Sequence, residues 1–87
     1  MIKILVIEDE EGLRRSIVET FKPLGYDVLE AATASEGMDI FKKETPNVIF
    51  LDIKLGESNG LDILKDIKAP SKKNIVIVVS SKNDKKT

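Results

Sequence analysis

Short apolar runs rich in branched residues alternate along this chain with segments of helical periodicity. The three longest runs are residues 2–7, 48–51 and 75–79. Residues 2–7 are almost wholly apolar, and runs of this kind are typical of strands covered on both faces. Because a parallel pair needs a crossover between its strands, strands that alternate with helices predict a parallel sheet. The chain is therefore expected to form a layered α/β domain.

A first helix is expected directly after the first strand. Apolar residues spaced by three or four positions form one helical stripe: Leu13, Ile17, Phe21 and Leu24. Pro23 should weaken the last turn of this helix, and Gly25 is a typical stop signal.

A shorter second strand at residues 27–32 leads into a second helix that ends near residue 43. Thr33 and Glu36 fit a capping box at the start of this helix. Ile40 and Phe41 are expected to face inward.

A third helix is expected after a loop at residues 54–59. Its apolar positions are Leu61, Leu64 and Ile67, and it should end before Pro70. Four strands and three helices thus alternate, and right-handed crossovers place helices on both faces of the sheet.

Acidic residues follow two of the predicted strands where each strand ends. Glu8, Asp9 and Glu10 come directly after the first strand, whereas Asp52 follows the apolar core of the third. In an open parallel sheet, the ligand site lies beyond the carboxyl ends of the strands. Shared protonation or a bound cation would relieve the repulsion there, and oxygen ligands favour magnesium or calcium over zinc. Asp52 could then act as a nucleophile toward a phosphoryl group.

Acids after strands also have an ordinary structural interpretation, because carboxylates are favourable at the start of a following helix. Glu10 fits that interpretation. Glu8 and Asp9 alone fit both interpretations equally, and Asp52 on a neighbouring strand end favours the functional one. Ser80 ends the fourth strand at the same edge, where its hydroxyl could reach a phosphoryl oxygen, although most such serines solvate a turn.

Charge and composition narrow the class of protein. A net charge of −1, from 14 basic and 15 acidic residues, argues against nucleic-acid or membrane binding through bulk charge. The chain has no cysteine and no histidine, so any imidazole in its chemistry must belong to another molecule. It also lacks a signal-peptide pattern and a run of roughly 20 apolar residues, so a cytoplasmic protein is expected.

Four stretches of this sequence together resemble the receiver domain of two-component response regulators. They are KILVIEDE, VIFLDIKL, Gly60 followed by LDILKDIK, and IVIVVSS, and they run along nearly the whole chain. The resemblance implies a flavodoxin-like (CheY-like) fold of three α/β/α layers. Residues 1–80 would form an incomplete receiver domain with strand order 2-1-3-4. Residues 81–87 would be a polar tail or the start of an unfinished fourth helix.

The resemblance also implies the chemistry of the acidic residues. Asp52 would be the phosphoacceptor, and Glu8 and Asp9 would be acids of a Mg²⁺ site. The backbone carbonyl of Lys54 would be a further metal ligand.

Two serines complete the implied site. Ser80 would occupy the hydroxyl switch position, and Ser81 would be the small residue that leaves access to the acceptor. The implied partner is a sensor histidine kinase or a histidine phosphotransfer protein. The domain would be a signalling phosphoacceptor rather than an enzyme, with at most weak self-phosphorylation and autodephosphorylation.

Two features depart from the family pattern. Gly56 stands where a proline is common, which predicts a more mobile loop with a less fixed metal geometry. The sequence also stops at Thr87, before the family's fifth strand and last helix. The strand at 75–79 is then expected to be an apolar sheet edge that favours a homo-oligomer, through strand pairing or exchange of elements.

Three functions are compatible with these observations. The first is a phosphoacceptor in a phosphorelay, and the second is an assembly module that uses the fourth-strand edge without productive phosphorylation. The third is an aspartate-dependent phosphohydrolase of another family, which is weakest because such enzymes need a second acid and a substrate-enclosing cap. The cognate kinase, the pathway and the downstream effector have no signal in the sequence.

Overall fold

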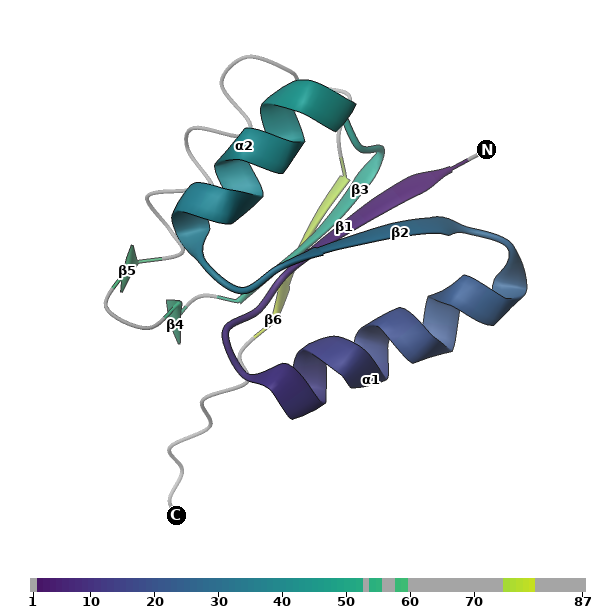
Figure 1. Cartoon of the computed structure of the whole chain (residues 1–87), viewed down its shortest axis with the longest axis horizontal. Coiled ribbons are helices and arrows are strands. Elements are labelled where there is room, and N and C mark those ends of the chain that lie inside the picture. The colour runs from purple at the N-terminus through teal and green to yellow at the C-terminus, as the bar shows by residue number, and fades with distance from the viewer. Residues whose placement is uncertain (1, 53, 56–57, 60–74, 80–87) are drawn as a thin grey trace.

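The computed structural model describes residues 2–52, 54–55, 58–59 and 75–79, and strands alternate with helices over residues 3–52 (Figure 1). The elements, in chain order, are β1 (Lys3–Ile7), α1 (Glu11–Phe21), the 3₁₀ turn η1 (Lys22–Leu24), β2 (Asp27–Ala31), α2 (Ala34–Glu44), β3 (Val48–Asp52), β4 (Lys54–Leu55), β5 (Ser58–Asn59) and β6 (Ile75–Val79). The predicted third helix, with Leu61, Leu64 and Ile67, lies outside the described residues.

The main sheet is parallel, with strand order β2-β1-β3-β6. Ile4 of β1 lies beside Val28 of β2 on one side and Val48 of β3 on the other. Counted within this sheet, the order is the 2-1-3-4 expected from the sequence, so the predicted α/β fold is confirmed.

Helices α1 and α2 lie on opposite faces of this sheet (Figure 1). Successive strand residues point to opposite faces, so β1 contributes Leu5 and Ile7 to the core under α2 and Ile4 and Val6 to the core under α1. All four side chains are at most 3% exposed. Burial on both faces explains why β1 is apolar from Ile4 to Ile7.

The end of α1 differs in part from the prediction. The helix ends at Phe21, Pro23 lies in η1, and Gly25 adopts the left-handed conformation with φ 97°, as the stop signals predict. Leu24, however, was predicted to lie on the inward stripe and is 68% exposed. A 3₁₀ turn rotates the chain by about 120° per residue instead of 100°, which moves Leu24 away from the stripe.

The start of α2 follows the predicted capping signal, with one change of partner. The Thr33 hydroxyl oxygen accepts a hydrogen bond from the Glu36 N–H at 3.1 Å. The Glu36 carboxylate accepts from the N–H of Ala32 at 2.9 Å, one residue before the helix cap. Inside the helix, Phe41 is buried and Ile40 packs against the same core, as predicted.

The segment predicted as a loop at residues 54–59 contains a short antiparallel pair. Lys54 pairs with Asn59 and Leu55 pairs with Ser58. The loop prediction was wrong for these four residues, because their backbones form an antiparallel pair.

None of the described helices is suited to crossing a membrane. The two α-helices have 11 residues each, about half the length that a bilayer requires.

Candidate functional site

Strands β1 and β3 bring acidic residues to the same edge of the sheet. Ile7 lies beside Leu51 in the parallel pairing, so the next residues along the two strands are Glu8 and Asp52. The predicted convergence of these acids therefore follows from the strand register.

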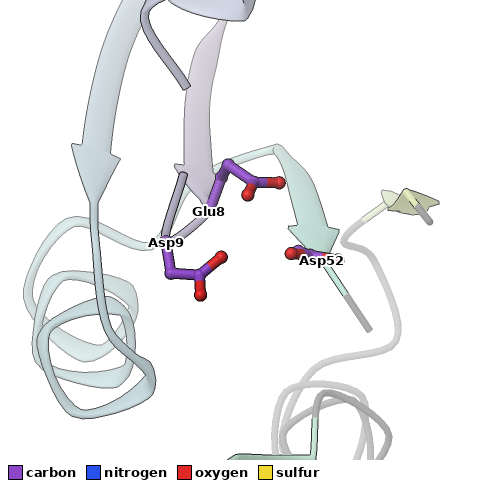
Figure 2. A group of neighbouring side chains, drawn as sticks. All are labelled: Glu8, Asp9 and Asp52. Carbon is purple, nitrogen blue, oxygen red and sulfur yellow. The ribbon is translucent and has the colours of Figure 1, made fainter. Parts of the chain in front are cut away.

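Figure 2 shows the carboxylates of Glu8, Asp9 and Asp52 facing a common space. One ligand oxygen from each residue lies within 4.8 Å of the other two. Glu8 and Asp52 are each 1% exposed, whereas Asp9 is partly buried. Two of the three acids are thus nearly inaccessible to solvent, and Asp9 forms the more open side of the cluster.

Mutual repulsion makes this arrangement costly without a compensating charge. Two ionised carboxylates whose oxygens lie 4.8 Å apart repel by about 3.5 kcal/mol, for an effective dielectric constant near 20. A cation among the three oxygens would replace repulsion by attraction.

The donor set fits a hard divalent cation. All three ligands are carboxylates, which magnesium and calcium prefer and zinc does not. Oxygens on opposite sides of Mg²⁺ lie about 4.2 Å apart, and those around Ca²⁺ about 5 Å apart. A spread of up to 4.8 Å therefore suits Ca²⁺ directly, and it suits Mg²⁺ if one acid binds through water, as is usual for that ion.

Backbone contacts determine how Glu8 is held. Its N–H donates to the Ala31 carbonyl at 3.0 Å, which continues the β1–β2 pairing by one residue. Its carboxylate oxygen Oε2 accepts from the Glu10 N–H at 2.9 Å. Glu10 itself occupies the N-cap position of α1, as predicted, but its side chain makes no capping hydrogen bond.

The other predicted site residues are not part of this geometry. Ser80 and Ser81 lie outside the described residues, as does the segment 81–87, so their roles and the domain boundary at residue 80 stay predictions. Lys54 begins β4, and its role as a carbonyl ligand also stays a prediction.

Two residues that lie near the site, Arg14 and Glu30, were not predicted from the sequence. Arg14 of α1 donates to the Glu8 carbonyl at 3.0 Å and to the Glu30 carboxylate at 3.0 Å. Glu30 sits in β2 on the face that packs against α1. An acid at that position of an otherwise apolar face is the signal that could have predicted a basic partner on the helix.

A family model described as the response regulator receiver domain matches residues 4–87. Among curated proteins, sporulation initiation phosphotransferase F of Bacillus subtilis is 34% identical over 79 residues, which are 91% of this chain and 64% of that protein. A probable transcriptional regulator of Porphyridium aerugineum is 35% identical over 78 residues, which are 90% of this chain and 32% of the regulator. The chain thus spans about a third of one relative and less than two thirds of the other.

Solved structures with a similar fold are also described as response regulator receiver domain proteins. A response regulator receiver domain protein from Clostridium thermocellum is 32% identical, with a TM-score of 0.86 over 97% of this chain and 68% of that one. A CheY-like receiver domain protein from Methanospirillum hungatei is 29% identical, with a TM-score of 0.88 over 92% of this chain and 64% of that one.

Proposed function

Because the chain belongs to the response regulator receiver domain family, whose members are signalling phosphoacceptors, we propose that Asp52 accepts a phosphoryl group from a phosphohistidine on a partner protein. The single observation that carries this proposal is the position of Asp52 at the end of β3, with an oxygen within 4.8 Å of oxygens of Glu8 and Asp9. The chain contains no histidine, which is consistent with a donor on another molecule.

The transfer conserves atoms and charge. An Asp52 carboxylate oxygen attacks the phosphorus, an acyl phosphate P–O bond forms, and the P–N bond to the donor imidazole breaks. The donor nitrogen keeps the electron pair of that bond and takes up a proton. A Mg²⁺ ion bound by Glu8, Asp9 and Asp52 would offset the negative charge on the transferred oxygens.

The remaining residues of the proposed site are taken from the family resemblance. Lys54 would add a backbone carbonyl to the metal ligands, Ser80 would donate its hydroxyl to the phosphoryl group, and Ser81 would leave room for the donor. The donor partner would be a sensor histidine kinase or a histidine phosphotransfer protein.

The test of this proposal is phosphoryl transfer from acetyl phosphate in the presence of Mg²⁺, followed by intact-protein mass spectrometry. We expect the unaltered chain to gain the mass of one phosphoryl group and Asp52→Asn to gain none. Asp39→Asn, which changes an exposed acid of α2, is the matched control and should still be labelled. A folded chain that gains no mass, or an Asp52→Asn variant that is labelled equally, would contradict the proposal.

A second function, self-association, is favoured by β6. Within the described sheet β6 is an edge strand, and its side chains Ile75 and Ile77 are 61% and 40% exposed. An apolar edge of this kind favours pairing with another strand. We propose a second copy of this chain as the partner, because β6 carries no charged residue and two copies could pair about a twofold axis without repulsion.

A further inference from the structure

The peptide that joins Glu8 to Asp9 is held from outside the site. Its carbonyl oxygen, that of Glu8, accepts a hydrogen bond from Arg14 Nη1 at 3.0 Å. The side chains of Glu8 and Asp9 are attached to the Cα atoms on the two sides of this peptide. The orientation of its plane therefore affects where both carboxylates point.

Arg14 is itself held in a defined orientation. Its Nε donates to Glu30 Oε1 at 3.0 Å, and its side chain is only 15% exposed. Because a guanidinium is planar, two hydrogen bonds in different directions fix its rotation as well as its position. The other Glu30 oxygen, Oε2, accepts from Arg15 Nη1 at 2.7 Å, so the acceptor is also restrained.

These contacts connect three elements to the site. Glu30 belongs to β2, Arg14 to α1, and the Glu8 carbonyl to the end of β1. With the bond from Glu8 N–H to the Ala31 carbonyl, the backbone of Glu8 is held on both its donor and its acceptor side.

We infer that Arg14 is a positioning residue for the acidic site, holding the Glu8–Asp9 peptide so that both carboxylates face the bound cation. The inference rests on the proposed function, since it assumes that the site binds Mg²⁺. It adds a residue that does not touch the metal or the phosphoryl group.

The geometric effect of Arg14 on metal affinity is opposite in sign to the effect of its charge. A fixed positive charge near the site repels Mg²⁺, so removing that charge would strengthen metal binding if charge alone mattered. Loss of an outer contact that orients metal ligands typically weakens binding 10- to 100-fold. The direction of the change therefore distinguishes positioning from simple electrostatics.

The test uses two substitutions at Arg14. Arg14→Lys keeps the positive charge but removes the planar guanidinium group, and Arg14→Gln removes both the charge and the guanidinium group. The matched controls are Arg15→Lys and Arg15→Gln, since Arg15 binds the same Glu30 but is 48% exposed and also pairs with Glu19. Mg²⁺ affinity is measured by NMR titration, which also reports whether each variant is folded.

We expect both Arg14 variants to bind Mg²⁺ about tenfold more weakly than the unaltered chain. Both Arg15 variants should stay within about twofold of it. An Arg14→Gln variant that binds as tightly as the unaltered chain, or more tightly, would overturn the inference. An Arg14→Lys variant with the same Mg²⁺ affinity as Arg15→Lys would also overturn the inference.

A second measurement needs no metal. The amide nitrogen of Asp9 belongs to the same peptide as the Glu8 carbonyl, so its ¹⁵N resonance responds to a hydrogen bond at that carbonyl. We expect this resonance to move in metal-free Arg14→Lys and to stay in place in Arg15→Lys. An unmoved Asp9 resonance would overturn the positioning role. An unaltered chain without Mg²⁺ affinity would instead contradict the metal site of the proposed function, and the Asp9 resonance would still decide whether Arg14 holds the peptide.

Discussion

Gly37 of α2 lies directly against Ile7 of β1. A Cβ atom added to Gly37 would lie 2.6 Å from Ile7 Cδ1 and 2.9 Å from Ile7 Cγ1. Ile7 is fully buried and immediately precedes Glu8. The absence of a side chain at Gly37 thus sets how closely α2 approaches the end of the strand that carries the site.

Substituting Gly37 by alanine should destabilise the domain. Alanine gains about 1 kcal/mol in helix propensity, but overpacking a buried contact costs about 1–3 kcal/mol. We expect a net loss of about 1 kcal/mol in the free energy of unfolding, measured by urea denaturation. In an Ile7→Val background, which lacks the Cδ1 atom, the loss should be smaller.

Gly12 provides the control for this substitution. It lies in α1, and the nearest atom to an added Cβ would be Glu10 Oε2 at 3.9 Å. Gly12→Ala should therefore stabilise the chain by up to about 1 kcal/mol. Equal effects of the two alanine substitutions would contradict the close packing of α2 on β1.

Replacing Thr45 by glycine should stabilise the chain. Thr45 follows α2 in the left-handed region, with φ 45°, where a β-branched residue is strained. The strain energy that is relieved exceeds the free-energy cost of glycine's added entropy in the unfolded chain. We therefore expect the free energy of unfolding, measured by thermal or urea denaturation, to rise by about 0.5–1 kcal/mol. Thr20→Gly, at an exposed position inside α1, should instead lose a few tenths of a kcal/mol. A loss of stability in Thr45→Gly would show that its backbone is not strained.

Mg²⁺ should raise the melting temperature of the domain, because only the folded chain brings the three acids together. At a Mg²⁺ concentration ten times the dissociation constant, binding adds about 1.4 kcal/mol to the free energy of unfolding. This corresponds to a rise in melting temperature of about 5–10 °C for a domain of this size. Asp9→Asn should remove most of this rise, whereas Asp27→Asn, an exposed acid at the other end of β2, should retain it. An equal rise in both variants would place the ion elsewhere. Chelation should return the melting temperature to its metal-free value.

A lysine at Ile77 should oppose the proposed pairing of β6 strands. Two copies would each bring a positive charge into an apolar edge, so sedimentation velocity should show more monomer for Ile77→Lys than for the unaltered chain. Leu24→Lys changes a residue that is 68% exposed and lies outside the sheet, and it should leave the distribution unchanged. A monomeric unaltered chain would refute the self-association proposal.

The features that could be predicted from the sequence are those set by local pattern. Strands β1, β3 and β6 are mainly apolar, and the alternation of strands with helices over residues 3–52 indicates the parallel order. The meeting of Glu8 and Asp52 could be predicted because both follow neighbouring strands at their carboxyl ends. These inferences need only the spacing of apolar residues along the chain and the handedness of the crossovers between parallel strands.

The features that could not be predicted depend on how separate elements fit together. Leu24 leaves the helical stripe because the backbone tightens after Phe21, and although Pro23 predicts a weakened last turn, it does not predict that the chain continues as a 3₁₀ turn. Arg14 reaches the Glu8 carbonyl only after α1 has packed on β2, so its role depends on tertiary structure rather than on spacing in the sequence.

The parallel pairing of β1 with β3 has a consequence for the chain during synthesis. The residues that carry Glu8 leave the ribosome well before those that carry Asp52, and a helix, a strand and a second helix intervene. A nascent chain therefore has Glu8 and Asp9 before it has Asp52, and a misfolded chain has all three acids without bringing them together. If Asp52 accepts a phosphoryl group as proposed, only chains that have completed this pairing would have the three acids assembled for the reaction.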